Sequence, residues 1–108
     1  MYAQVTSINV PVGTMSEMRR LIEDEYLPRV RTRPGFVAAY LLEQLDDREA
    51  AKLIMFWDNQ AAVETFNRSG LIEASVNVLA SRLPGARVQR QGYHVSAVAE
   101  PHADKQTP

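Results

Sequence analysis

The middle of the chain, residues 36–57, reads FVAAYLLEQLDDREAAKLIMFW. Its two apolar runs, residues 36–45 and 51–57, flank the polar residues 46–49, which predicts two strands joined by a hairpin loop. Side chains alternate between the two faces of a strand, and here the residues expected on both faces are apolar. The expected sets are Phe36, Ala38, Tyr40 and Leu42 against Val37, Ala39 and Leu41, then Leu53, Met55 and Trp57 against Ile54 and Phe56.

The segment before this hairpin predicts a strand and then a helix. Residues 2–12 are rich in β-branched side chains, which favour strands. Thr14 stands three residues before Glu17, the spacing of a capping box that begins a helix. Pro28 predicts a kink or a restart of this helix, because proline lacks a backbone donor. The apolar stripe of the helix consists of Met18, Leu21, Ile22, Tyr26 and Val30.

The segment after the hairpin repeats this pattern. Asp58 is the expected N-cap of a second helix, which breaks at Gly70 and ends at Leu83. Residues 86–99 predict a fourth strand. The order β-α-β-β-α-β is typical of an α+β, ferredoxin-like fold: a four-stranded antiparallel sheet with two helices on one face. We therefore expect one domain over residues 1–99 and a flexible C-terminal tail over residues 100–108.

Both faces of the central strands are apolar, but two helices can cover only one face of the sheet. The other face is expected to form an exposed apolar patch larger than monomers usually carry. The economical way to cover it is a second copy of the chain. We therefore expect a homodimer that packs sheet face on sheet face.

Composition excludes several classes of function. Twelve Lys and Arg residues balance thirteen Asp and Glu residues, so we expect neither nucleic acid nor an anionic membrane as a partner. The chain has no cysteine and only two histidines, which argues against a metal site and excludes thiolate chemistry. No apolar run is long enough to span a membrane, and no secretory signal is recognisable, so the expected compartment is the cytoplasm.

Three short motifs resemble the antibiotic biosynthesis monooxygenase domain. These are the Arg33-Pro34-Gly35-Phe36 turn, the run from Phe56 to Ala62 (FWDNQAA), and the Leu83-Pro84-Gly85 turn before the last strand. The resemblance covers about residues 3–98 and places the chain in the dimeric α+β barrel superfamily. It implies a pocket in each protomer between the sheet and the helices.

The resemblance also implies particular chemistries. The family includes cofactor-free oxygenases of phenolic or polyketide compounds, haem-degrading enzymes and quinol oxygenases. In the phenol-oxidising members an Asn, a Trp and a Tyr act together; Trp57 matches the Trp, but Leu53 and Val63 stand at the other two positions. At the haem-binding positions the best matches are Phe66 and Val76, which cannot ligate iron, so we expect no haem and no other cofactor.

Few side chains qualify as catalytic candidates. His94 is the best general base in the domain, and Tyr40 could orient a phenol or quinone oxygen, although both residue types also occur as ordinary sheet residues. Trp57 is either a core anchor or a pocket wall that stacks a flat substrate. The expected substrate-binding set is Trp57, Asn9, Phe56 and Phe66.

Two functions of different classes fit these observations. The first is a cofactor-independent monooxygenase acting on a small apolar, aromatic or quinonoid compound, with His94 or Tyr40 assisting proton removal. The second is a non-catalytic dimeric barrel, such as a ligand carrier or a stress-related protein, which Leu53 and Val63 favour. An isomerase or cyclase on the same fold is a weaker third. The first hypothesis requires that Trp57, Tyr40 and His94 meet in one cavity.

Overall fold

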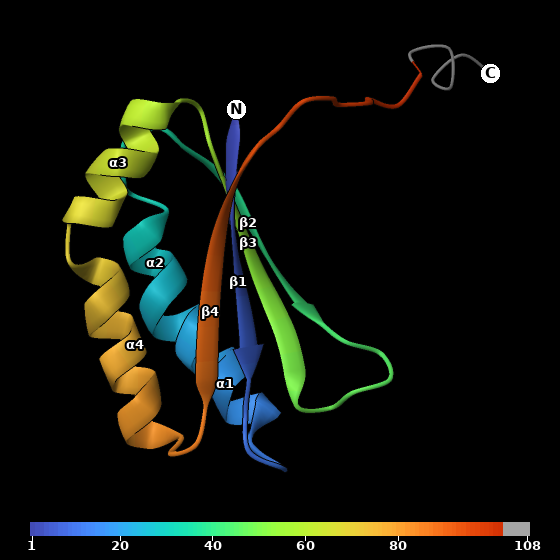
Figure 1. The fold of residues 1–108 in the computed structure, drawn as a ribbon, viewed down its shortest axis with the longest axis vertical. Helices are drawn as coiled ribbons and strands as arrows, with labels where there is room; N and C mark the ends of the chain where they lie inside the picture. The colour runs from blue at the N-terminus through green and yellow to red at the C-terminus, as the bar shows by residue number, and fades with distance from the viewer. Residues whose placement is uncertain (103–108) are drawn as a thin grey trace.

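A computed structural model describes residues 1–102 of the chain. Its antiparallel sheet has the strand order β2-β3-β1-β4. The strands are β1 (Tyr2–Asn9), β2 (Phe36–Glu43), β3 (Ala50–Trp57) and β4 (Arg87–His94), and the helices are α1 (Met15–Leu21), the π-helix η1 (Ile22–Tyr26), α2 (Leu27–Val30), α3 (Gln60–Arg68) and α4 (Leu71–Arg82). All helices lie on one side of the sheet (Figure 1). The predicted ferredoxin-like α+β fold is confirmed.

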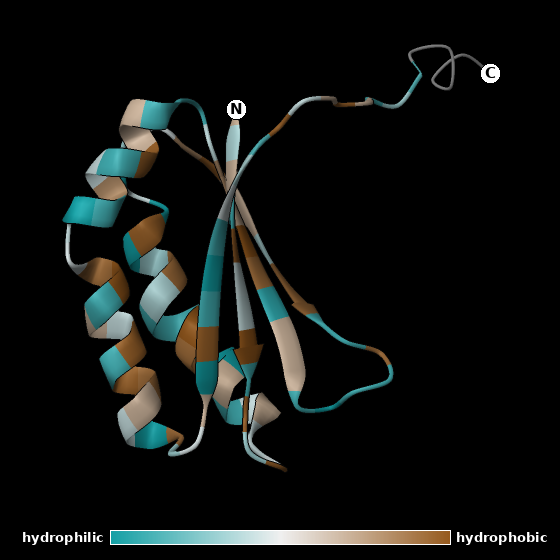
Figure 2. Cartoon of the chain, in the orientation of Figure 1, coloured by the Kyte–Doolittle hydropathy of each residue, from teal (hydrophilic) through white to brown (hydrophobic). Residues whose placement is uncertain are grey.

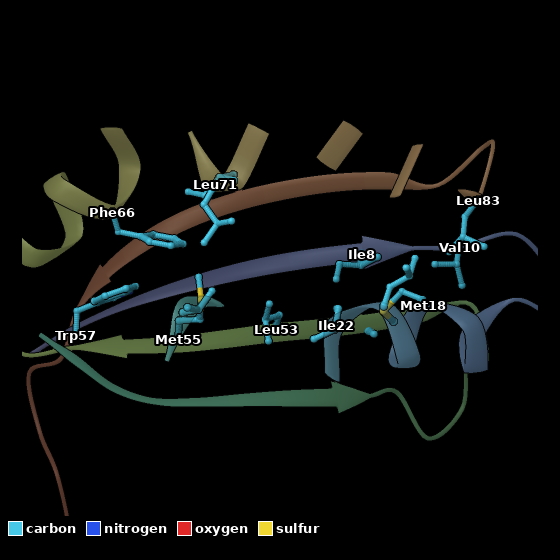
Figure 3. Close-up of a cluster of buried hydrophobic side chains, with 14 of the residues drawn as sticks. Ile8, Val10, Met18, Ile22, Leu53, Met55, Trp57, Phe66, Leu71 and Leu83 are labelled. Atoms are coloured by element: carbon cyan, nitrogen blue, oxygen red, sulfur yellow. The ribbon is translucent and has the colours of Figure 1, made fainter. Parts of the chain in front are cut away.

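The hydrophobic core fills the space between the sheet and the helices. Leu53, Met55 and Trp57 point from β3 toward the helices and are buried, as their alternation predicted. From the helical layer, Phe66 packs on Trp57 at one end of the core, and Met18 lies beside Ile22 and Val10 at the other (Figure 3). Burial of this apolar surface is the main source of stability for a domain of this size.

The first helical segment begins and continues differently from the prediction. Thr14 is the residue before α1, but its hydroxyl donates to the Pro11 carbonyl at 2.6 Å and makes no cap bond, so the capping-box prediction is wrong. Near Pro28 the helix is irregular but does not restart: the π-helix η1 runs directly into α2, and Tyr26 and Leu27 at the junction keep helical backbone angles. Proline lacks the N–H that a regular α-helix would use, and the π-turn before it is where the regular pattern is interrupted.

The second helical segment starts one residue later than predicted. Asn59, not Asp58, is the N-cap: its Oδ1 accepts from the backbone N–H of Ala62 at 2.9 Å. Asp58 is still tied to the sheet end, because its N–H donates to the Gly35 carbonyl at 2.8 Å. The predicted break at Gly70 is confirmed, with a left-handed φ of 78° between α3 and α4.

A β-bulge changes the faces of β2. The register shifts between Phe36 and Ala38, so Phe36 pairs with Trp57 on the helix side, and the prediction that it shares a face with Tyr40 is wrong. Beyond the bulge the alternation holds, and Tyr40 and Leu42 lie on the face away from the helices, 56% and 48% exposed. We call this side the open face; it carries Val5, Ser7, Asn9, Ala38, Tyr40, Leu42, Lys52, Ile54, Phe56, Arg87, Gln89, Gln91 and Tyr93.

The last strand is shorter than predicted. β4 ends at His94 because its partner β1 begins at Tyr2, and only the Val95 N–H continues the ladder, to the Met1 carbonyl at 2.9 Å. Most of β4 is hydrophilic (Figure 2), and the chain then runs away from the sheet (Figure 1). Residues 103–108 of the predicted tail lie outside the described residues. No helix within residues 1–102 is long and apolar enough to cross a membrane.

Candidate functional site

A cavity of about 110 Å³ lies between the sheet and the helices. We call it the sheet–helix cavity. Its apolar lining comes from both layers of the fold and comprises Ile8, Leu21, Ile22, Leu53, Ile72, Ala74, Val76, Val78, Leu79 and Val88. Thr6 and Arg90, which pair across β1 and β4, are its polar residues on the sheet side. Glu25, Tyr26, Arg29 and Ser75 are its polar residues on the helical side.

The π-helix places polar residues at the edge of this cavity. A π-turn holds one more residue than an α-turn, and such turns occur frequently at functional sites. Both Glu25 and Tyr26 lie in η1 and line the cavity, as does Arg29 in the following turn. Glu25 is already engaged, because its carboxylate accepts from the Arg82 guanidinium of α4 at 2.8 Å.

The phenol of Tyr26 has a raised pKa in this cavity. Burial raises the pKa of its phenol to about 12, although the positive charge of Arg90 acts in the opposite direction. Desolvation disfavours the charged phenolate, so Tyr26 stays protonated at physiological pH. It is therefore a hydrogen-bond donor in this cavity, not a base.

Sequence reasoning missed the functional potential of Tyr26 and Arg90. Tyr26 was assigned to the apolar stripe, and no motif in the sequence singles out Arg90. Arg29 belongs to a short basic run with Arg31 and Arg33, which the sequence allows to be either a solvated helix end or a site for an anionic substrate. The one signal that points to Tyr26 and Arg29 is Pro28, which marks the irregular helix that turns both residues to the cavity. The position of Arg90 follows only from its pairing with Thr6.

Trp57 and Phe66 are core residues. Trp57 is fully buried, and its ring packs on Phe66 with ring centroids 4.8 Å apart (Figure 3). Phe36 packs edge-to-face on the same indole, with centroids 5.7 Å apart. The indole N–H donates to Gln4 Oε1 at 3.1 Å, and Gln4 Nε2 donates to Asn67 Oδ1 at 2.8 Å. Neither aromatic ring lines the sheet–helix cavity.

The other predicted site residues lie elsewhere. Tyr40 and Phe56 form an edge-to-face pair on the open face, with ring centroids 6.2 Å apart, and Asn9 lies on the same face. His94 lies on the helix side at the end of β4, beside the ring of Tyr2 at 5.6 Å. It lines an open depression with Gln60, Glu64 and Asn67. Trp57, Tyr40 and His94 therefore do not meet in one cavity.

Metal-binding geometry is not found in the described part of the chain. Within residues 1–102, no three His, Cys, Asp or Glu side chains cluster closely enough to hold an ion.

The fold and the sheet–helix cavity define a class: small α+β domains with a cavity between an antiparallel sheet and its helices. Within that class, the sequence model of the family described as antibiotic biosynthesis monooxygenase matches residues 1–78. The chain belongs to this family. No curated protein matches its sequence.

Solved structures agree with this assignment at the level of the fold. A candidate antibiotic biosynthesis monooxygenase from Deinococcus radiodurans superimposes with a TM-score of 0.76 at 14% identity, covering 93% of this chain and 97% of that chain. SnoaB, a cofactor-independent oxygenase from Streptomyces nogalater, has a TM-score of 0.75 at 16% identity, covering 90% and 94%. A point mutant of MhuD, solved with two manganese protoporphyrin IX molecules per active site, has a TM-score of 0.65 at 20% identity, covering 93% and 100%.

Proposed function

We propose that this chain is a cofactor-independent monooxygenase that acts on a small aromatic or quinonoid compound in the sheet–helix cavity. The observation that carries the proposal is the cavity, which has apolar walls from both layers of the fold and a few polar side chains at its edge. Ligand pockets have this composition because apolar walls bind the body of a ligand and sparse polar groups orient it. The family supplies the reaction class.

The proposed reaction draws its electrons from the substrate. At an activated CH2 carbon of an electron-rich ring system, one atom of dioxygen becomes the carbonyl oxygen, and the other leaves with both hydrogens as water. The two C–H bonds supply the four electrons that reduce dioxygen. The protein contributes an oriented site, which raises the rate by holding the reacting groups in place.

Tyr26 is the residue that we propose to hydrogen-bond the substrate oxygen. It lines the cavity, and with a pKa of about 12 it keeps the proton that it donates. His94 and Tyr40 have no proton-transfer role in this cavity, because neither side chain lines it. Proton removal then depends on the acidity of the substrate and on water at the cavity mouth.

The second candidate is a non-catalytic ligand-binding protein of the same fold. Leu53 lines the sheet–helix cavity and Val63 lines the depression beside His94, so neither position offers a polar group to the chemistry implied by the resemblance. A cavity that lacks the catalytic Asn and Tyr would still bind an apolar compound. This alternative predicts binding without turnover.

Oxygen uptake on a panel of anthrones, phenols and hydroquinones tests the proposal. We expect uptake by the wild type and at least a tenfold loss in Ser75→Phe, because the added ring fills the cavity from α4. The matched control is Asn77→Phe, an exposed position on the same helix that does not line the cavity. Ligand binding without uptake would favour the carrier, and uptake unchanged in Ser75→Phe would place the reaction outside this cavity.

We further propose that the working unit is a homodimer joined through the open face. Support comes from the apolar side chains of that face that no element of residues 1–102 covers, among them Ile54, Phe56 and Tyr40. A second copy supplies a complementary apolar surface by two-fold symmetry. The sheet–helix cavity lies on the other side of the sheet, so each copy would keep its own cavity.

A further inference from the structure

The edge of the sheet–helix cavity carries positive charge that the protein does not neutralise. Arg90 enters from β4 and Arg29 from α2. Within residues 1–102, neither guanidinium has an ion pair or a hydrogen bond. The one carboxylate that lines the cavity, Glu25, is held by both terminal nitrogens of Arg82, at 2.8 and 3.4 Å.

The neutral polar groups of the cavity are also without protein partners. The hydroxyls of Tyr26 and Thr6 make no hydrogen bond within the described residues, although both side chains line the cavity. Thr6 faces Arg90 directly across the β1–β4 pair, so the donors of both residues are on the helix side of the sheet. The positive charge of Arg90 acts on the Tyr26 phenol, so the two side chains lie near each other. Donors that gather at one end of an apolar cavity match an oxygen acceptor on a ligand.

We infer that the ligand of this cavity is an apolar molecule with one ionised oxygen group, a carboxylate or an enolate or phenolate, which Arg90 binds. The inference rests on the proposed function, because it assumes that the cavity holds a ligand. The apolar body lies among the side chains of α4 and β3, and the anion lies between Arg90 and the Tyr26 hydroxyl. Charge-assisted hydrogen bonds from a guanidinium are about twice as strong as neutral ones, so Arg90 sets the preference for an anion.

A cation on a strand need not line a cavity, and Arg87 provides that comparison. It lies on the same strand three residues earlier, but on the open face, opposite Asn9. Glu73 of α4 also acts on Tyr26, but it does not line the cavity. Arg90 differs from Arg87 in its neighbours, because it lines the sheet–helix cavity together with Thr6 and Tyr26.

Calorimetric titration with isosteric probes tests the inference. The pairs are 1-naphthoate against 1-naphthamide and 4-nitrophenolate against 4-nitroanisole, which separate the two kinds of anion. We expect at least one anion to bind tenfold or more tightly than its neutral partner, with a preference that decreases in high salt. Arg90→Gln should abolish the preference while leaving binding of the neutral probe unchanged, and Arg90→Lys should keep part of it. The matched control, Arg87→Gln, should bind like the wild type.

The outcomes separate this inference from the proposed function. If neutral probes bind as tightly as the anions, or if Arg90→Gln retains the preference, the inference is overturned. The proposal that the cavity binds an apolar ligand is then still supported. If no probe binds the wild type at millimolar concentration, the inference and the proposed function both fail. Arg90 is exposed, so its replacement leaves the core packing intact, which circular dichroism checks.

Discussion

At the scale of single residues, Trp57 orients its neighbours, because its indole N–H can donate a hydrogen bond but cannot accept one. The indole N–H fixes which end of the Gln4 amide faces it, and Gln4 then fixes Asn67. The three side chains join β3, β1 and α3 in one chain of hydrogen bonds, buried at Trp57 and reaching the surface at Asn67. The residue that resembled a catalytic element therefore holds the sheet and the helix together.

Tyr26 gives the molecule a specific response to alkaline pH. Its pKa is raised to about 12 in the folded protein, against about 10 in an unfolded chain. Between these values the unfolded state releases a proton that the folded state keeps. We therefore expect the free energy of unfolding to fall as pH rises from about 10 to about 12.

Urea denaturation at several pH values measures this loss. Tyr26→Phe should remove the tyrosine part of the decline, because phenylalanine has no proton to release. Tyr40→Phe, on the open face, retains Tyr26 and should decline like the wild type. An unchanged decline in Tyr26→Phe would contradict the assignment.

At the scale of elements, the turn from α2 into β2 depends on Gly35. Its φ is +80°, and a Cβ added there would lie 2.4 Å from the Cβ of Ala62 at the start of α3. Gly70, between α3 and α4, has a similar φ of +78° but open space around it. Alanine substitutions at the two glycines therefore separate the cost of backbone strain from the cost of steric overlap.

Gly35→Ala should destabilise the fold more than Gly70→Ala. The left-handed conformation costs an alanine about 1–2 kcal/mol at either position, and overpacking adds about 1–3 kcal/mol at Gly35. Denaturant midpoints at constant m-value measure the difference. Equal losses in the two variants would mean that α3 moves away from the turn without cost.

The sequence predicted the kinds of element better than their ends. The order of strands and helices follows from hydrophobic periodicity, and every predicted element is present. The first helix starts after Thr14 as predicted, but the capping bond was wrong, because the Thr14 hydroxyl donates to the Pro11 carbonyl. The second helix is capped by Asn59 and not by Asp58, whose N–H is bonded to the Gly35 carbonyl at the end of the sheet. Those partners become available only when the chain is folded.

At the scale of the whole molecule, the uncovered apolar face predicts self-association. Ile54 lies in the middle of the open face, paired with Val5 and Tyr40 on the neighbouring strands. Ile54→Asp places a charge where the second copy is expected, and burying an unpaired charge is costly. We expect the wild type to sediment as a dimer at micromolar concentration and Ile54→Asp to shift it toward the monomer.

Leu45→Asp is the control for this experiment. Leu45 is fully exposed in the hairpin loop, outside the open face, so its replacement should leave the sedimentation coefficient unchanged. A wild type that sediments as a monomer at micromolar concentration would disprove the homodimer.

The candidate site could be predicted only in part. The resemblance implied a pocket between sheet and helices, and a cavity lies there. The sequence offers only residue types as a guide to the lining of this pocket, and residue types pointed to His94, Trp57 and Tyr40. The folded chain places these residues outside the cavity. Tyr40 and Phe56 lie on the open face, and Trp57 is enclosed by Phe36 and Phe66.

The sequence by itself determined the order of the elements and the presence of two apolar sheet faces, because periodicity is a local property of the chain. Only the tertiary structure decided which side chains share a cavity. The π-helix before Pro28 turns Tyr26 and Arg29 toward the sheet, and the β1–β4 register places Arg90 opposite Thr6. Each of these positions depends on a small irregularity or on pairing between distant segments, and neither has a periodic signature in the sequence.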